Sequence, residues 1–157
     1  MATDQNGNML AVELTYASVA DATAFPGLLD EVPNPVKCIT ADGGVDRREV
    51  YAAARKRVAT MVIPPRRGAI VSGAPVLCDR DAHLERIQEV GRRRWRLEAG
   101  QHQQARAENT FYRTKKRFGA RLSTRNEEAQ RNEVLTACNI LNKMTELGMP
   151  NSVALLG

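Results

Sequence analysis

Cysteine, histidine and long apolar runs are scarce in this sequence. Its 157 residues include three cysteines and two histidines. The cysteines are far apart and form no C-x-x-C pair, so they predict neither a disulfide framework nor a zinc site. No apolar run approaches the roughly 18 residues of a membrane-spanning helix, and the polar first residues do not resemble a secretory signal. We therefore expect a cytoplasmic protein with no membrane partner.

Aromatic side chains are also few, at 4% of the chain. The common RNA-binding modules carry aromatic residues on exposed strands, where bases stack on them. This scarcity argues against a small basic RNA-binding α/β protein, which we keep as an alternative.

Basic residues, by contrast, are abundant and clustered. The net charge is +5, but residues 1–46 carry −6, residues 47–125 carry +13 and residues 126–157 carry −2. Most basic residues of the middle segment are arginines, whose planar guanidinium group matches two phosphate oxygens at once. The segment therefore favours a polyanionic partner, DNA or RNA, bound with release of counterions. The alternative is a solvated arginine-rich face.

Apolar and turn patterns predict an α/β fold with a helical C-terminal half. A β-hairpin is expected over 2–15, because Asn6, Gly7 and Asn8 form a turn signal. Helices and strands then alternate, which is typical of a sheet with crossover connections. The expected helices span 22–31, 47–57, 83–98, 101–118 and 126–147, and the expected strands span 35–41 and 59–63. Asp21 and Asp46 are expected to cap the first two helices.

Asp42 is the first candidate for chemistry. It ends an apolar strand and is followed by two glycines. In an α/β sheet the carboxyl edge of the strands is where sites form, and glycines let a ligand approach the backbone. The alternative is an ordinary aspartate in an Asp-Gly turn.

Glu108 is the second candidate. In the helix expected over 101–118 it shares a face with Gln101, Gln104 and Lys115. Taken alone, a glutamate in an arginine-rich helix is typical of a surface charge. Paired with Asp42 it offers the hard oxygen ligands that Mg²⁺ prefers, although two-metal phosphoryl-transfer sites usually need a third carboxylate.

Several segments carry a family resemblance over nearly the whole chain. They are TADGGVD at 40–46, TMVIPPRR at 60–67, GRRRW at 91–95, RAENTFYRTK at 106–115, and the apolar helix pattern at 134–149. Together they resemble the DDE transposases of bacterial insertion sequences, whose catalytic domain has an RNase H-like fold. The resemblance implies an α/β fold in which a mixed sheet is flanked by helices.

The resemblance also assigns roles to the two candidates. Asp42 would be the second metal-binding aspartate and Glu108 the third acidic ligand, with Mg²⁺ as the metal and Mn²⁺ able to substitute. Lys115 fits the lysine of the family's Y-R-E-K signature and would contact a phosphate near the cleaved end. The tyrosine and arginine of that signature are Gln101 and Gln104 here, which removes a charge-assisted contact.

Four further residues are candidates for DNA contacts. Arg106, Arg113 and Lys116 are expected to bind backbone phosphates, with a solvated face as the alternative. Trp95 is either a core residue or a platform on which a splayed base stacks.

The resemblance also predicts that a strand is missing. In the family the first catalytic aspartate lies on a strand before the hairpin arm that ends near Asp4, and that strand is not in this sequence. We therefore expect residues 1–157 to form a single, N-terminally truncated RNase H-like domain. Its parts would be a sheet-forming half at 1–65, a loop at 66–82, and a helical half at 83–157 that bears the catalytic glutamate.

The function implied by the resemblance is that of a bacterial insertion-sequence transposase. Such an enzyme binds inverted-repeat ends and target DNA, and it cleaves and transfers strands in DNA transposition. It is expected to act as a homo-oligomer when intact and to associate with the nucleoid. With one of three metal ligands missing, we expect this chain to be inactive. The alternative is a non-catalytic DNA-binding remnant or a regulator of an intact transposase.

Overall fold

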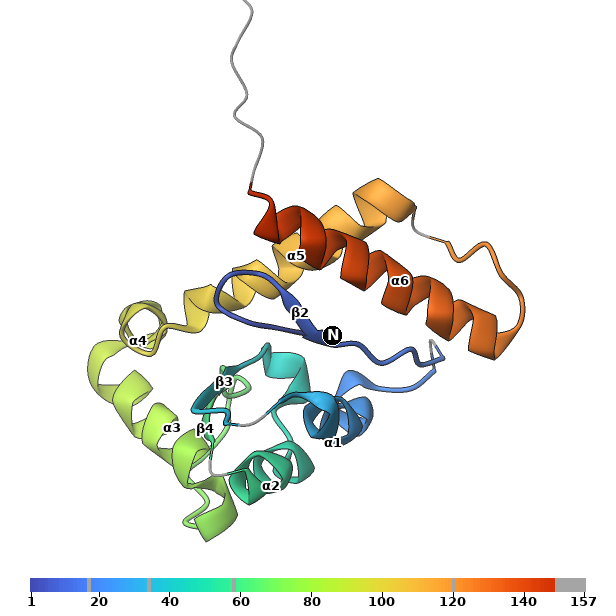
Figure 1. Ribbon diagram of the computed structural model, residues 1–157. Coiled ribbons are helices and arrows are strands. Elements are labelled where there is room, and N and C mark those ends of the chain that lie inside the picture. The colour runs from blue at the N-terminus through green and yellow to red at the C-terminus, as the bar shows by residue number, and fades with distance from the viewer. Residues whose placement is uncertain (17, 34, 58, 120, 149–157) are drawn as a thin grey trace, which may run out of the picture.

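A computed structural model describes residues 1–16, 18–33, 35–57, 59–119 and 121–148. The described residues form a mixed α/β fold with two small sheets and six α-helices (Figure 1). The strands are β1 (Ala2–Thr3), β2 (Met9–Ala11), β3 (Cys38–Thr40) and β4 (Thr60–Val62). The α-helices are α1 (Asp21–Glu31), α2 (Arg48–Lys56), α3 (Cys78–Val90), α4 (Arg92–Glu98), α5 (Ala105–Phe118) and α6 (Glu127–Glu146). Short 3₁₀ turns are η1 (Gly43–Val45), η2 (Pro75–Leu77) and η3 (Gln101–Gln104).

The expected hairpin is confirmed, although its second arm ends earlier than expected. β1 and β2 pair in antiparallel fashion. The Asp4 carboxylate accepts hydrogen bonds from the backbone N–H groups of Asn6 and Asn8, at 2.8 and 2.9 Å. Gly7 supplies the positive φ of 84° that the turn requires. Asp4 is therefore a turn residue.

The two later strands form a separate sheet. β3 and β4 are parallel, with Ile39 opposite Met61, and the chain crosses between them through η1 and α2. A parallel pair needs such a crossover, as the alternation of elements predicted. The described strands thus make two two-stranded sheets and no single mixed sheet.

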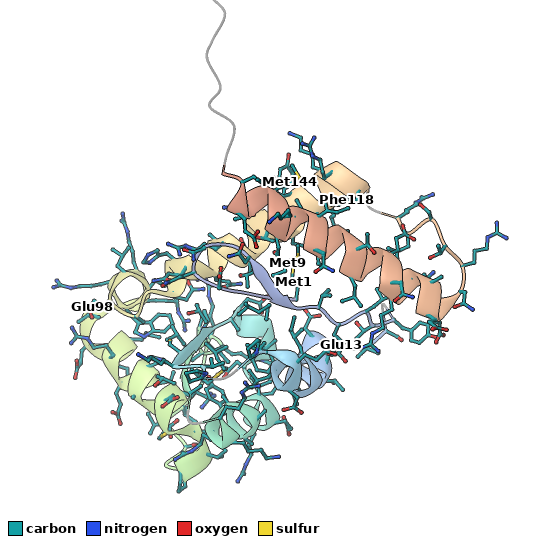
Figure 2. All side chains as sticks on the ribbon, in the orientation of Figure 1. Met1, Met9, Glu13, Glu98, Phe118 and Met144 are labelled. Atoms are coloured by element: carbon teal, nitrogen blue, oxygen red, sulfur yellow. The ribbon has the colours of Figure 1, made fainter. Side chains whose placement is uncertain are left out.

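The larger apolar cluster surrounds the parallel pair. α2 packs against β4 and α1 packs against α2. Within this cluster Val50, Met61 and Ile63 are at most 1% exposed. A smaller cluster joins the hairpin to α6 through Met9, Cys138 and Leu141, and Met1 and Met144 pack against it (Figure 2). The hairpin therefore lies between the parallel sheet and the α5–α6 pair (Figure 1).

Asn142 of α6 bonds the backbone of β2 directly. Its amide oxygen accepts from the Met9 N–H at 2.7 Å, and its amide nitrogen donates to the Met9 carbonyl at 2.8 Å. This side chain satisfies both backbone groups of Met9, as a neighbouring strand would.

The helix expected over 83–98 is in fact two helices. Gly91, with a φ of 79°, ends α3 and precedes α4. α3 also begins at Cys78, so the loop expected over 66–82 is shorter than predicted. Two carboxylates in its first turn explain this start: Asp79 accepts from the Met61 N–H at 2.8 Å, and Asp81 accepts from the Gly73 N–H at 2.8 Å.

The helix expected over 101–118 begins as the 3₁₀ turn η3 and becomes α-helical at Ala105. The two predicted caps are wrong, because neither Asp21 nor Asp46 caps its helix. Asn126 does cap α6, accepting from the N–H groups of Glu128 and Ala129. Within the described ranges, no helix combines the length and the apolar character that crossing a bilayer requires.

Candidate functional site

An open pocket of about 460 Å³ lies where the end of β3, the corner after β4, α4, and the start of α5 meet. Its lining includes two carboxylates, Asp42 and Glu108, which are separated by 66 positions in the sequence. Four arginines, two glutamines and two prolines line the rest, together with Gly43. The two residues that the sequence singled out for chemistry thus share one pocket.

Asp42 follows β3 directly and caps the 3₁₀ turn η1. Its Oδ1 accepts a hydrogen bond from the Gly44 N–H at 2.7 Å. A Cβ at Gly44 would lie 2.8 Å from that oxygen, and a Cβ at Gly43 would lie 3.1 Å from the Pro64 carbonyl oxygen. The two glycines therefore permit a turn that brings Asp42 against the corner after β4. The turn uses one carboxylate oxygen and leaves the other for a ligand.

Glu108 lies in the first turn of α5 and is held by two glutamines. Gln101 Nε2 donates to Gln104 Oε1 at 2.7 Å, and Gln104 Nε2 donates to Glu108 Oε1 at 3.3 Å. These are the two glutamines that we expected, from the resemblance, at the tyrosine and arginine positions of the Y-R-E-K signature. Among the described residues the hydrogen-bond partner of the Glu108 carboxylate is thus a neutral amide.

The corner at Pro64 and Pro65, both of which are buried, also lines the pocket. Arg66 and Arg67 follow this corner and line the pocket. Arg92 Nη1 donates to the Pro65 carbonyl at 2.8 Å and thereby ties α4 to the corner.

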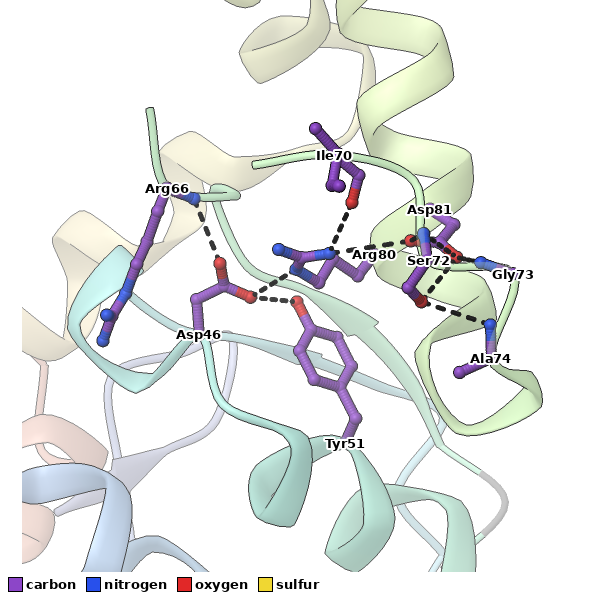
Figure 3. Close-up of polar contacts among 9 residues, drawn as sticks. All are labelled: Asp46, Tyr51, Arg66, Ile70, Ser72, Gly73, Ala74, Arg80 and Asp81. Atoms are coloured by element: carbon purple, nitrogen blue, oxygen red, sulfur yellow. Dashed lines mark hydrogen bonds and ion pairs between the residues drawn. The ribbon is translucent and has the colours of Figure 1, made fainter. Parts of the chain in front are cut away.

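Asp46 fixes the backbone behind this corner (Figure 3). Its Oδ2 accepts from the Arg66 N–H at 3.0 Å, and its Oδ1 accepts from the Tyr51 hydroxyl at 3.1 Å and from Arg80 Nε at 3.2 Å. Burial, followed by the nearby Asp46 charge, raises the pKa of Tyr51, so its hydroxyl stays a donor. Asp46 is thus a buried anchor of the corner and does not cap α2.

A second carboxylate holds the rest of the same loop. Asp81 accepts from the N–H groups of Ser72 and Gly73 and pairs with Arg80 at 3.6 Å (Figure 3). Burial alone would raise the pKa of Asp81, but these hydrogen bonds, with Arg80, bring the pKa below its ordinary value. The loop between β4 and α3 is therefore tied at both ends.

Trp95 is buried, with 1% of its surface exposed. Its Nε1 donates to His83 Nδ1 at 3.1 Å, and His83 Nε2 lies 2.9 Å from the Met61 carbonyl oxygen. Of the two alternatives for Trp95, the structure favours the core residue, because a buried ring offers no face to a base.

The other predicted DNA-contact residues lie along α5. Arg106 donates to the Gln5 carbonyl, and Arg113 donates to the Thr145 hydroxyl at 3.4 Å. Lys115 and Lys116 are exposed, and their ammonium groups lie over the rings of Phe111 and Tyr112. Both lysines are therefore accessible, whereas both arginines already bond other parts of the chain.

The pocket offers the type of ligand that a divalent cation prefers, but it offers too few such ligands. Asp42 and Glu108 supply hard carboxylate oxygens. Across the described part of the chain, however, no group of three or more His, Cys, Asp or Glu side chains could hold a metal ion. These residues by themselves do not form a complete metal site.

The comparison with known families agrees with the resemblance seen in the sequence. The transposase DDE domain family matches residues 1–143. The chain therefore belongs to the transposase DDE domain family. No solved structure matches it.

Sequence reasoning missed the four arginines of the pocket, Arg66, Arg67, Arg92 and Arg96. Two follow a Pro-Pro corner and two are spaced i, i+4 on α4. That second spacing puts both side chains on one face of a helix, which is the signal that could have found the α4 pair.

Proposed function

We propose that this chain is the DNA-binding part of a transposase catalytic centre, of the kind found in bacterial insertion sequences. The observation that carries the proposal is the shared pocket. It brings together two carboxylates, one after β3 and one on α5, and four arginines from the corner after β4 and from α4. Carboxylates bind divalent cations, and guanidinium groups bind phosphates. Membership of the transposase DDE domain family supports DNA as the partner.

Asp42 and Glu108 are proposed to hold Mg²⁺ or Mn²⁺ together with a third carboxylate from outside the described residues. The absence of a three-carboxylate group among those residues supports this division. Two carboxylates on separate elements bind a hard divalent cation weakly. The isolated chain is therefore proposed not to cleave DNA.

The separate sheets support an RNase H-like arrangement completed by a further strand. The hairpin β1–β2 and the parallel pair β3–β4 each have an unpaired edge, and an additional strand between them would make one mixed sheet. Such a strand could also carry the third carboxylate. Homo-oligomerisation on paired DNA ends and association with the nucleoid belong to the same proposal.

A cleavage assay tests the catalytic part of the proposal. The purified chain is incubated with DNA that carries inverted-repeat ends, with Mg²⁺ or Mn²⁺, beside Asp42→Asn and Glu108→Gln variants. We expect no metal-dependent cleavage from any of the three proteins. Cleavage by the unaltered chain that is lost in Glu108→Gln would overturn the proposed inactivity and would make the chain a nuclease.

DNA binding without chemistry is the second candidate function, favoured by the net charge of +13 over residues 47–125. Such a protein would occupy DNA ends and interfere with an intact transposase. It predicts that affinity for DNA falls steeply as salt rises, since bound phosphates release counterions. A flat salt dependence, measured by fluorescence anisotropy, would contradict both candidate functions.

A further inference from the structure

Three arginines of the pocket have guanidinium groups without an acidic partner among the described residues. Arg93 of α4 is also without one, but it lies outside the pocket. On α3 and α4, Arg86 and Arg94 both pair with Glu98 at 2.9 Å. By contrast, the guanidinium groups of Arg66, Arg67 and Arg96 form no hydrogen bond or ion pair within the described part of the chain. Three unpaired guanidinium groups thus border one pocket.

The backbone that carries these three arginines is fixed by buried residues and hydrogen bonds. Arg66 and Arg67 follow two buried prolines, and the Arg66 N–H is bonded to the buried Asp46. Arg96 lies one turn after Arg92, whose bond to the Pro65 carbonyl joins α4 to the corner. The side chains therefore converge on one site although they come from two elements.

The charge balance of the pocket calls for an anion. With Arg92 included, four guanidinium groups face two carboxylates, Asp42 and Glu108. A cation at the carboxylates would leave the excess positive charge larger still. A concave site with a net positive charge concentrates anions, and a planar guanidinium group matches the two free oxygens of a phosphodiester.

We propose that Arg66, Arg67 and Arg96 form a clamp for consecutive phosphodiester groups of one nucleic-acid strand, which crosses the pocket mouth past Asp42 and Glu108. This inference rests on the proposed function, because it takes DNA as the partner, and it names the residues that hold the strand there. The clamp fixes the backbone and reads no base, since its groups recognise phosphate alone. A polynucleotide is favoured over free phosphate because the pocket is open and its arginines come from two separate segments, the corner after β4 and α4.

The test compares clamp variants with a matched control. Arg67→Gln, Arg96→Gln and the double variant are measured by fluorescence anisotropy on a labelled duplex over a range of salt concentrations. Arg93→Gln is the control, because Arg93 is exposed on the same helix as Arg96, lies outside the pocket and loses the same charge. Thermal unfolding followed by circular dichroism checks that every variant is folded.

For each single clamp variant we expect about tenfold weaker binding and a salt slope smaller by about 1, as for the loss of one phosphate contact. Arg93→Gln should weaken binding less than about twofold. A binding loss in Arg93→Gln equal to that in the clamp variants would overturn the clamp while leaving DNA binding intact. If the unaltered chain shows no salt-dependent binding at all, the proposed function fails, and the clamp fails with it.

Two competitors distinguish the source of the phosphate. Unlabelled duplex should displace the labelled duplex at micromolar concentration, whereas inorganic phosphate at the same ionic strength should not. Displacement by inorganic phosphate at equal concentration would show a site for a free anion and would overturn the assignment to a polynucleotide strand.

Discussion

Asp46 shows how one buried carboxylate can organise a loop. It is 8% exposed and bonds Tyr51, Arg80 and the Arg66 backbone. At the sequence level it fits a helix cap, because aspartate before a helical pattern usually caps it. The structure uses it elsewhere because the partly buried Arg80 bonds it from 34 positions further along the chain, and such a contact leaves no local pattern.

Replacing Asp46 should be costly. Asp46→Ala leaves the buried Tyr51 hydroxyl and the partly buried Arg80 without this acceptor, so we expect a loss of about 3 kcal/mol in the free energy of unfolding. Urea denaturation measures it. Glu49→Ala is the control, since Glu49 is exposed on α2 and its loss should stay within about 0.5 kcal/mol. Equal losses would show that the Asp46 contacts contribute little.

Glycine is required at position 43 because the backbone passes close to the Pro64 carbonyl oxygen there. A methyl group there would lie 3.1 Å from the Pro64 carbonyl oxygen, a backbone atom that cannot move independently. Gly43→Ala should therefore push the corner away from Asp42 and destabilise the fold by about 1–3 kcal/mol, with weaker DNA binding. Gly68→Ala is unsuitable as a control because its φ is positive. Ser18→Ala, at an exposed position, should be neutral in the same urea titration.

Asp81 makes the loop sensitive to acid. Its pKa is lower in the folded protein than the ordinary value of 3.8, so the unfolded chain takes up a proton first as the pH falls. The stabilisation by Asp81 is fully present above about pH 5 and is lost as the pH drops through the folded-state pKa. The stability difference between the unaltered chain and Asp81→Asn should therefore shrink below about pH 4. A difference that is constant from pH 7 to pH 3, in urea titrations, would contradict this assignment.

At the scale of elements, local patterns predicted the order of strands and helices well and their ends poorly. The hairpin, α1, β3, α2 and β4 occur in the predicted order. The split at Gly91 was missed because the apolar spacing continues through it. The early start of α3 was missed because it depends on Asp79 and Asp81, which bond residues of β4 and of the loop before α3. Such tertiary contacts are invisible to periodicity.

Part of the candidate site was predicted from the sequence and part was not. The resemblance singled out Asp42 and Glu108, and the structure brings them to one pocket. Their metal-binding roles stay predictions. Arg66 and Arg67 could not be found from sequence, because they lie in a loop whose path depends on Asp46 and Asp81.

Asn142 adds two hydrogen bonds to the apolar cluster that docks α6 on the hairpin. Asn142→Ala would leave the N–H and C=O groups of Met9 without their partner, at a cost of about 2 kcal/mol in unfolding free energy. Asn139→Ala is the matched control, since Asn139 is exposed on the same helix. Chemical denaturation of both variants checks the prediction, and equal stability would mean that water replaces the amide.

At the scale of the whole molecule, the two apolar clusters differ in size. Among the described residues, the cluster around β4 has eight buried members, some of them only 0–1% exposed, whereas the cluster at the hairpin has three. Amide hydrogens of α2 and β4 should therefore exchange more slowly than those of β1 and β2, because local opening occurs first where little apolar area is buried. Equal protection in a hydrogen-exchange experiment would instead show one cooperative unit.

The contact between Trp95 and His83 gives the molecule an internal optical reporter. Trp95 is the single tryptophan of the sequence, and its ring lies edge-on to His83 with centroids 5.2 Å apart. Its emission therefore depends on whether α4 is packed against α3 and, through the His83 contact with Met61, on β4. The same helix carries Arg92 and Arg96 into the pocket, so a shift in tryptophan fluorescence on adding DNA would register a rearrangement beside the arginines without any attached dye.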